Sequence, residues 1–351
     1  MQYLIDASVY VFRAYYSMPD DMVDEQGNPV NALYGFCRFI GDFMENVTPE
    51  YVAVLFDESL SQSFRSEIYP LYKANRDPAP PELKRQFEQC RRFVRALGVM
   101  EHASPTYEAD DLIGTLVAHG RNRGRASTIV SRDKDLTQLL TREDVFWDFS
   151  GKGKLRYDEI PDSFGVWPEQ IADFLALAGD AVDNIKGVPG VGKKTAVGLL
   201  DHFGSLEAIY DNLDRVHEVK VRGARTLATK LEIHRDDAML ARRLTGIACD
   251  APIEDAETAM QPTAPRLGEI NALFDEAGIR GRAAEALRKP IRENVQLISK
   301  GVLIGIGRHP PHQLHTEATG LHILRRDDRR GPQVCLRGRE GEAGRHDPDD
   351  L

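Results

Sequence analysis

The first half of the chain alternates short runs of apolar or β-branched residues with stretches of helical periodicity. Four runs predict buried strands, at residues 3–5, 51–56, 127–130 and 145–147. Spacings of four, three, four and three predict one apolar helix face, formed by Leu83, Phe87, Cys90, Val94 and Leu97. Because strands alternate with helices, we expect an α/β fold whose sheet of mainly parallel strands is flanked by helices.

From about residue 158 the apolar pattern is helical throughout. It predicts helices at 160–179, 194–203, 205–212 and 222–235, separated by turns that contain glycine and proline. We therefore expect a core domain at 1–157 and a helical domain at 158–300. Periodicity ends near residue 305, and the charged composition of residues 305–351 predicts a disordered tail.

The composition narrows the class of protein. Hydrophobic residues make up 42% and charged residues 28% of the 351 residues, as in ordinary globular proteins. The four cysteines form no CxxC pair, which disfavours a zinc site, and no apolar run is long enough to span a membrane. We expect a cytoplasmic protein. The net charge of −10 by itself disfavours a nucleic-acid partner, unless the acidic residues are concentrated at one place.

Acidic residues follow three of the predicted strands. Asp6 follows residues 3–5, Asp57 follows residues 51–56, and Asp133 and Asp135 come just after residues 127–130. The carboxyl ends of parallel strands meet at one edge of a sheet, so we expect these side chains to converge there. A single aspartate is more often a turn residue or helix cap, but three strand ends together favour a site.

Two more acidic groups extend this set. Glu108, Asp110 and Asp111 precede a predicted helix, and Asp180 and Asp183 share a face if their turn is helical. Nine carboxylates cannot share a pocket without cations, and ligands that are all oxygen favour Mg²⁺ or Mn²⁺. We expect two such ions, which suits the hydrolysis of phosphodiesters. These acids account for nine of the ten excess negative charges.

A basic segment lies between the second predicted strand and the helix at 83–97. It contains Arg65, Tyr72, Lys73 and Arg76. The residues alone leave two interpretations open. They form a solvated helix face, or the cations contact phosphate oxygens while the aromatic ring stacks on a base.

A glycine-rich turn starts at residue 187. Gly187, Gly190 and Gly192 are followed by Lys193 and Lys194, which nearly matches a P-loop. However, Lys194 stands where a P-loop has serine or threonine, and no strand precedes the turn. A helix–hairpin–helix at 184–200 fits better, because its backbone N–H groups can hold a DNA phosphate whatever the base sequence.

These segments together resemble the 5′-nuclease (flap endonuclease) family, which includes the 5′→3′ exonuclease domain of bacterial DNA polymerase I. The resemblance covers residues 1 to about 290. Its motifs lie at residues 4–8 with 13–15, 56–57, 72–76, 107–111, 131–136 and 179–192. It implies a PIN-like sheet, a helical arch near 72–100 and a helical DNA-binding domain that contains the helix–hairpin–helix.

The resemblance also implies a role for each site residue. Asp6, Asp57, Glu108, Asp110, Asp111 and Asp133 would surround one metal ion, and Asp135, Asp180 and Asp183 would hold the second. Lys73 and Arg76 would contact the scissile phosphate, and Tyr72 and Arg65 would bind the DNA. The hairpin, with Lys193 and Lys194, would bind the downstream duplex and a K⁺ ion.

The activity implied is a structure-specific 5′→3′ exonuclease and 5′-flap endonuclease in DNA replication and repair. Its substrates would be branched or 5′-ended duplexes, flaps and RNA–DNA primer junctions. The enzyme would act as a stand-alone monomer, away from membranes, with a DNA polymerase acting in trans. A PIN-like ribonuclease would normally lack the helical domain, and a non-catalytic binding module would gain nothing from crowded acids near phosphates.

Overall fold

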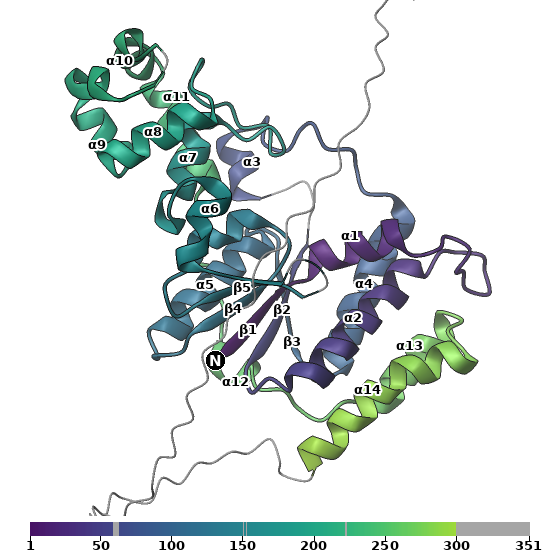
Figure 1. The fold of residues 1–351 in the computed structure, drawn as a ribbon. Coiled ribbons are helices and arrows are strands. Elements are labelled where there is room, and N and C mark those ends of the chain that lie inside the picture. The colour runs from purple at the N-terminus through teal and green to yellow at the C-terminus, as the bar shows by residue number, and fades with distance from the viewer. Residues whose placement is uncertain (59–62, 150, 152, 222, 300–351) are drawn as a thin grey trace, which may run out of the picture. The chain divides into compact units, whose positions relative to one another are not determined.

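The central feature of the computed structural model is a six-stranded sheet with the strand order β3-β2-β1-β4-β5-β6 (Figure 1). The structure describes residues 1–351 except 59–62, 150, 152, 222 and 300–351, so the predicted tail at 305–351 lies outside the described residues. Five strands are parallel, and β6 pairs antiparallel with β5. The strands are β1 (Gln2–Asp6), β2 (Val52–Asp57), β3 (Met100–Ser104), β4 (Ser127–Val130), β5 (Val145–Asp148) and β6 (Gly153–Arg156).

The four predicted strands are confirmed as β1, β2, β4 and β5, and β3 and β6 were missed. Both missed strands lie at the edges of the sheet, where polar residues are tolerated and the apolar signal is weak. In the central strands successive side chains enter opposite cores. Leu4 packs into the core that contains α5, whereas Ile5 packs into the core under α1 and α2.

Helices cover both faces of the sheet, as predicted. The helices of the first part of the chain are α1 (Ala7–Ser17), α2 (Asn31–Val47), α3 (Phe64–Ile68), α4 (Pro81–Ala96) and α5 (Ala109–Arg121). The apolar stripe predicted at 83–97 is buried in α4, which packs against α2 and β3. Because α4 belongs to this packed layer, the arch predicted near 72–100 is wrong from Pro81 onward; only residues 69–80 pass beside the strand ends as a non-helical segment.

The second part of the chain consists of helices. It contains α6 (Ile160–Phe164), α7 (Ile171–Ala178), α8 (Lys193–Phe203), α9 (Leu206–Asp211), α10 (Ala224–Ile233), α11 (Arg235–Thr245), α12 (Ala256–Ala259), α13 (Leu267–Glu276) and α14 (Gly281–Ser299). The single helix predicted at 160–179 is divided, because Gly165 adopts a φ of +79° and Pro168 starts a new turn. Short 3₁₀ turns complete this part: η1 (Lys134–Leu139), η2 (Tyr157–Glu159), η3 (Pro168–Gln170) and η4 (Leu213–Glu218).

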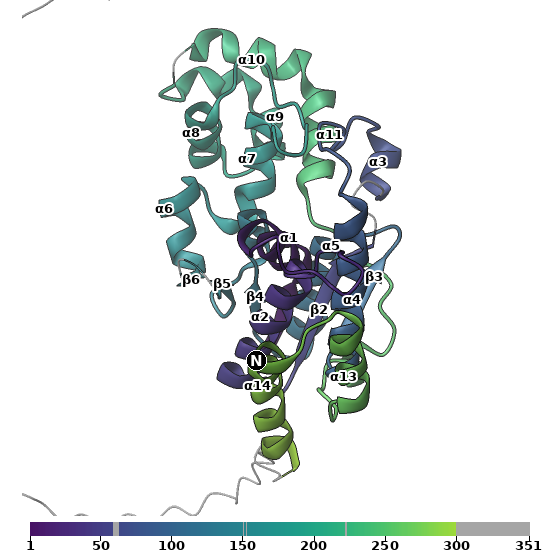
Figure 2. The same ribbon diagram turned by 90° about the vertical axis from the view of Figure 1, so that its right-hand side faces the viewer.

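The last two helices return to the sheet. Figures 1 and 2 both show α14 beside α2, and α13 packs on α4. Ile270, Phe274 and Leu287 are buried in the same core as α1 and α2. The helical domain predicted at 158–300 therefore ends earlier, since its last helices complete the first layer.

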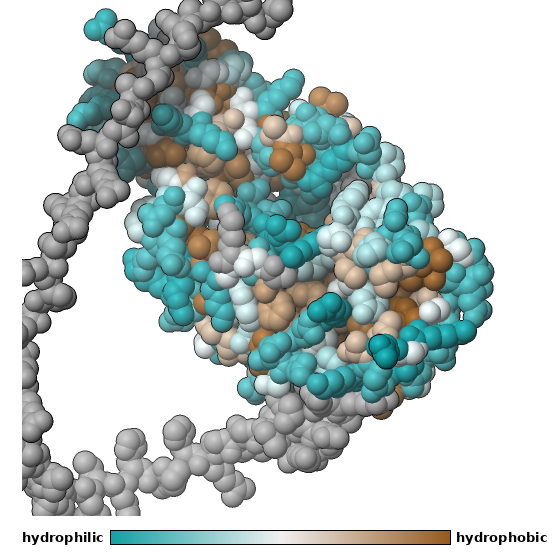
Figure 3. All heavy atoms as spheres, turned by 45° about the vertical axis from the view of Figure 1, so that its right-hand side comes forward, coloured by the Kyte–Doolittle hydropathy of each residue, from teal (hydrophilic) through white to brown (hydrophobic). Residues whose placement is uncertain are grey.

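No helix in the described part of the chain is both long enough and apolar enough to span a bilayer. On the face shown in Figure 3, hydrophobic surface is scattered in small patches among hydrophilic residues.

Candidate active site

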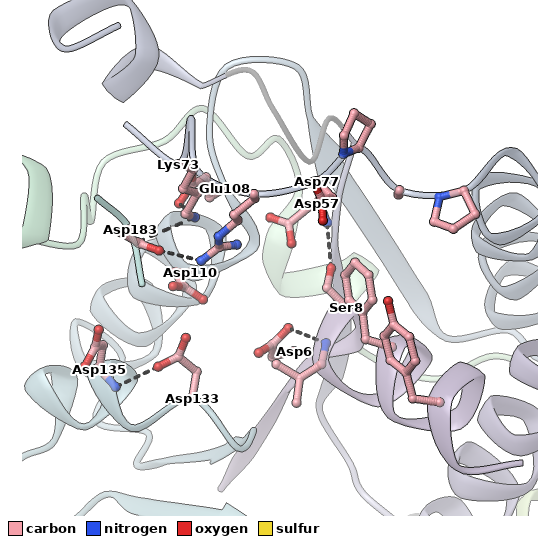
Figure 4. A pocket seen from close by; sticks show the side chains of 17 residues that line it. Asp6, Ser8, Asp57, Lys73, Asp77, Glu108, Asp110, Asp133, Asp135 and Asp183 are labelled. Carbon is pink, nitrogen blue, oxygen red and sulfur yellow. Dashed lines mark hydrogen bonds and ion pairs between the residues drawn. The ribbon is translucent and has the colours of Figure 1, made fainter. Parts of the chain in front are cut away.

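Most of the predicted carboxylates line one pocket of about 450 Å³ at the carboxyl ends of the strands (Figure 4). Seven of the nine lie there: Asp6, Asp57, Glu108, Asp110, Asp133, Asp135 and Asp183. Lys73 and Arg76 line the same pocket. The expected convergence at one sheet edge is therefore confirmed, because β1 and β2 end at Asp6 and Asp57 and α5 begins beside them.

Local hydrogen bonds orient the two strand-end aspartates. Asp6 accepts a 2.7 Å hydrogen bond from the Ser131 hydroxyl and a longer one from the backbone N–H of Val9, so it also caps α1. Asp57 accepts from the backbone N–H of Ala109 at 2.9 Å. Each carboxylate is thus tied on one side to the scaffold and faces the pocket on the other.

The next two aspartates enter the pocket from the turn after β4. The Asp133 carboxylate accepts from the backbone N–H of Asp135 at 2.9 Å, which caps the 3₁₀ turn η1. This tight turn brings both residues to the pocket although they are only two positions apart. Figure 4 shows them side by side, across the pocket from Asp6.

The crowding of these acids is visible in their pKa values. Burial and the neighbouring Asp57 raise the pKa of Asp6 to about 7, and burial and Asp133 raise that of Asp135 to about 7. Burial, with Asp133 and Asp6 nearby, raises the pKa of Asp110 well above its usual range. The pocket therefore holds its negative charge at a cost that a cation would relieve.

The donor set fits hard divalent cations. Its ligands are carboxylate oxygens, which Mg²⁺ and Mn²⁺ prefer. In the described residues no three acidic, histidine or cysteine side chains are arranged closely enough to hold an ion as they stand. Side-chain rotation within the pocket is therefore needed for chelation.

All four named residues of the basic segment contact Glu108 or Asp183, and the Arg65 guanidinium lies 3.7 Å from Glu108. The Lys73 ammonium lies 2.9 Å from Glu108 and 3.8 Å from Asp183, and Arg76 forms an ion pair with Asp183. The Tyr72 hydroxyl donates to Glu108 at 3.0 Å and to Asp183 at 3.1 Å. Burial by itself would lower the pKa of Lys73 and raise that of Glu108. The attraction between the two opposite charges outweighs burial, so the pKa of Lys73 is raised and that of Glu108 is lowered.

The base-stacking role predicted for Tyr72 is wrong in this structure. Its side chain is only 6% exposed and belongs to the apolar core, so neither ring face is open to a base. Two aromatic residues of α1, Phe12 and Tyr16, line the pocket instead, and Tyr16 is 75% exposed. Neither aromatic residue was among the predicted site residues, and nor was Asp77, which also lines the pocket. The signal for Tyr16 was an aromatic residue in the helix that follows Asp6.

Arg65 and Asp111 do not reach the pocket, which corrects their predicted roles. Arg65 forms two 2.7 Å hydrogen bonds with the Asp111 carboxylate and donates to the backbone carbonyls of Leu244 and Gly246. Asp111 also accepts from the backbone N–H groups of Glu108 and Ala248. With both carboxylate oxygens used and no solvent exposure, Asp111 holds the scaffold together and is not available to an ion.

Asp180 lies beside the pocket rather than in its lining. Residues 180–185 form a turn closed by paired backbone hydrogen bonds between Asp180 and Ile185, so the two aspartates do not share a helix face. Asp180 accepts from the backbone N–H of Val182 and lines a neighbouring cavity of about 820 Å³ together with Asp135, Lys134, Lys186 and Lys193. Asp135 lines both cavities and connects them.

The glycine-rich turn lies between α7 and α8, but residues 184–192 contain no helix. The bounds predicted for the helix–hairpin–helix, 184–200, are therefore wrong, because the helix before the turn is α7 and ends at Ala178. Gly190 has a φ of +84°, and a Cβ at Gly187 would lie 2.3 Å from the backbone nitrogen of Gly179, so both positions need glycine. α8 begins at Lys193, and the N–H groups of a first turn have no partner within the helix. Lys230 of α10 approaches Gly190 and adds a cation that was not among the predicted site residues.

Comparison with known proteins agrees with this arrangement. The family described as 5′-3′ exonuclease, N-terminal resolvase-like domain, matches residues 1–165, and the 5′-3′ exonuclease, C-terminal SAM fold, matches residues 166–267. DNA polymerase I of Pseudomonas aeruginosa is 37% identical over 82% of this chain and 31% of its own length. The chain thus spans about a third of that curated relative. A 5′-3′ exonuclease of Buchnera aphidicola is 33% identical over 71% of this chain and 87% of its own length.

Solved structures share the fold. A bacteriophage T5 flap endonuclease in complex with DNA and metal ions has a TM-score of 0.56 at 20% identity, over 84% of this chain and 99% of its own. Human GEN1 bound to Holliday junction DNA has a TM-score of 0.57 at 14% identity, over 90% and 76% of the two chains. Since the family descriptions together span residues 1–267 and the Buchnera relative matches over most of its length, this chain belongs to the 5′-3′ exonuclease family.

Proposed function

We propose that this chain is a metal-dependent, structure-specific 5′→3′ exonuclease and 5′-flap endonuclease that hydrolyses DNA phosphodiesters. One observation carries the proposal: seven carboxylates from separate elements converge in one pocket with Lys73 and Arg76 beside them. The family membership and the name of the Buchnera relative support the same reaction. A non-catalytic binding module would not need acids at the place where phosphates approach.

The proposed site holds two Mg²⁺ or Mn²⁺ ions. One is held by Asp6, Asp57, Glu108, Asp110 and Asp133, and the other by Asp135, Asp183 and the nearby Asp180. When bound, such ions supply an activated water and stabilise the departing 3′-oxygen. Lys73 and Arg76 lie at the same pocket and stabilise the negative charge that develops on the phosphate. The product then carries a 5′-phosphate.

The substrate is proposed to be a 5′-ended or branched duplex, including 5′ flaps and RNA–DNA primer junctions. Tyr16 and Phe12 offer an aromatic surface for an unpaired base at the pocket rim. The hairpin before α8, with Lys193, Lys194 and Lys230, offers backbone N–H groups and cations to the duplex backbone. The carbonyls of this hairpin are also the proposed site of a K⁺ ion.

The biological setting is proposed from the relatives. DNA polymerase I homologues combine a segment like this chain with much further sequence, which supports a role in replication and repair with a polymerase acting in trans. We propose that the chain works as a monomer in the cytoplasm. Size-exclusion chromatography with light scattering tests the monomer, since a stable dimer would contradict it.

A substrate panel tests the proposed function. Labelled 5′-flap duplex, nicked duplex, single-stranded RNA and intact circular duplex are incubated with the protein and Mg²⁺. We expect cleavage of the flap near its junction, 5′-phosphate products and no cleavage of the circle. Preference for single-stranded RNA would favour a PIN-like ribonuclease, and tight binding to the flap without cleavage would favour a binding module.

A further inference from the structure

Two segments far apart in the chain are held together beside the carboxylate pocket. They are residues 69–76, which carry the catalytic cations, and the turn at 180–185. The backbone N–H of Lys73 donates to the Asp183 carbonyl at 3.0 Å, and the Asn75 amide donates to the Ala181 carbonyl at 3.1 Å. The Asn184 amide donates to the Leu71 carbonyl at 2.7 Å. These contacts all involve main-chain groups, so they fix the path of the backbone.

Both segments contain a residue in the left-handed region. Lys73 has a φ of +54° and Asn184 a φ of +57°, and they are two of the four non-glycine residues with positive φ in the described part of the chain. Asparagine tolerates this conformation, whereas lysine adopts it only at a cost in free energy. A strained lysine persists only where its surroundings hold it, and here the 180–185 turn does so.

The conformation of Lys73 decides where its ammonium group points. The Leu71 carbonyl that accepts from Asn184 also accepts from the backbone N–H of Ala74 at 3.2 Å, so it closes the turn around Lys73. From this turn the Lys73 ammonium reaches Glu108 at 2.9 Å. Without the amide of Asn184, the Leu71 carbonyl that closes the turn loses the hydrogen bond that holds it in place.

We propose that Asn184 is a positioning residue, whose side-chain amide holds the turn at 69–76 so that Lys73 and Arg76 face the scissile phosphate. This inference rests on the proposed function for the role of the two cations. Asn184 is not one of the described residues that line the carboxylate pocket; it lines the neighbouring cavity with Asp135 and Asp180. It acts through the backbone of Leu71 and needs no contact with substrate or metal.

The test combines two measurements on the full chain. The first is the rate at which trypsin cleaves after Lys73, which reports whether the turn is held and needs no nuclease activity. The second is the steady-state cleavage of a 5′-flap duplex, separated into kcat and KM. The variants are Asn184→Ala and Asn184→Gly; the glycine keeps access to positive φ but removes the amide. Asn46→Ala is the matched control, since that exposed amide donates to a backbone carbonyl within its own helix.

We expect both Asn184 variants to be cut faster after Lys73 and to lose kcat by about 10-fold or more, with KM nearly unchanged, because small misplacements of a catalytic group lower turnover. Asn46→Ala should match the wild type in both measurements. Unchanged proteolysis and kcat in both variants would overturn the proposal. So would a glycine variant that behaves as the wild type while the alanine variant fails, because backbone conformation rather than the amide would then be the cause.

The two proposals fail in different ways. If the wild type does not cleave the flap, the proposed function fails, while the trypsin measurement still reports whether Asn184 holds the turn. If the wild type cleaves and the Asn184 variants are proteolysed faster without loss of kcat, the amide holds the turn but does not position the cations. That result overturns the positioning role alone.

Discussion

The guanidinium of Arg65 and the carboxylate of Asp111 form two hydrogen bonds of 2.7 Å in the interior, where Asp111 has no solvent exposure. Asp110, the preceding residue, lines the carboxylate pocket instead. Two adjacent aspartates at the start of α5 thus have different roles. One joins the elements of the scaffold, and the other belongs to the charged site.

Asp111→Asn should therefore destabilise the fold by roughly 3–5 kcal/mol, as expected when one partner of a buried ion pair is removed. Asp110→Asn should leave stability unchanged or raise it in EDTA, because it removes a repelled charge. Urea unfolding of both variants measures the difference. An Asp111→Asn variant with the unfolding midpoint of the wild type would show that this carboxylate is not structural.

Stability in EDTA should depend on pH in the direction set by Asp6 and Asp135. Both have pKa values of about 7 in the folded protein, above the ordinary value of 3.8. The folded state therefore binds more protons than the unfolded state between about pH 4 and 7, and these groups lose their stabilising contribution as the pH rises through that window. Thermal unfolding from pH 5.5 to 8 should show a falling Tm. A Tm that rises through this range would contradict the crowding of these acids.

Asp135→Asn should weaken the stabilising effect of divalent ions. In EDTA at pH 8 the variant should be more stable than the wild type, because a charge repelled by Asp133 and its neighbours is removed. In excess Mg²⁺ the wild type should gain more stability, since ligand binding to the folded state stabilises it. Asp144→Asn is the control. Asp144 accepts from the backbone N–H of Ser127 and from Arg121, so its loss should destabilise the fold with or without Mg²⁺.

Lys73→Ala should lower turnover far more than duplex affinity. The ammonium sits among the pocket carboxylates, whereas the proposed duplex contacts lie at the hairpin. We expect kcat to fall by about 100-fold or more, as for other groups that stabilise transition-state charge, with binding changed little. Lys84→Ala, at an exposed position of α4, should change neither. A loss of affinity with kcat unchanged in Lys73→Ala would mean that this lysine serves binding alone.

Tyr16, rather than Tyr72, should stack on an unpaired base. Tyr16→Ala should weaken binding of a 5′ single strand by about 1–3 kcal/mol, and Tyr16→Phe should restore it, because the ring supplies the contact. Tyr72→Phe removes the hydroxyl that bridges Glu108 and Asp183, so it should alter turnover without weakening single-strand binding. Fluorescence anisotropy with a labelled 5′ flap measures these affinities. A larger loss of binding from Tyr72→Phe than from Tyr16→Ala would reverse the assignment.

The sequence predicts the central strands and the convergence of the acids because both follow from patterns within single segments. Continuous apolar runs identify β1, β2, β4 and β5, and the aspartates that follow them must meet when the strands are parallel. The edge strand β3 was not predicted, because only one of its five residues, Met100, is buried. Its position depends on pairing with β2, which no local pattern encodes.

The errors at the site have a similar cause. Arg65 and Asp111 are of types that are common in functional sites. In the structure they pair with each other, 46 positions apart, and so neutralise each other's charge. Tyr72 is an aromatic residue in a basic segment, and only the packed structure shows that its ring is buried. Likewise α13 and α14 are amphipathic helices whose sequence does not say which core they join. In each of these cases, contacts between residues far apart in the sequence determine where the side chain or helix lies.

The central claim is that the carboxylate pocket cleaves DNA with divalent ions, and flap cleavage by site variants tests it most directly. Cleavage of a 5′-flap duplex is measured in Mg²⁺ and in EDTA for the wild type, Asp110→Asn and Asp183→Asn, with folding of each confirmed by thermal unfolding. We predict that EDTA abolishes cleavage by the wild type and that both folded variants lose at least about 100-fold in Mg²⁺. Cleavage that persists in EDTA, or at the wild-type rate in both variants, would contradict the claim.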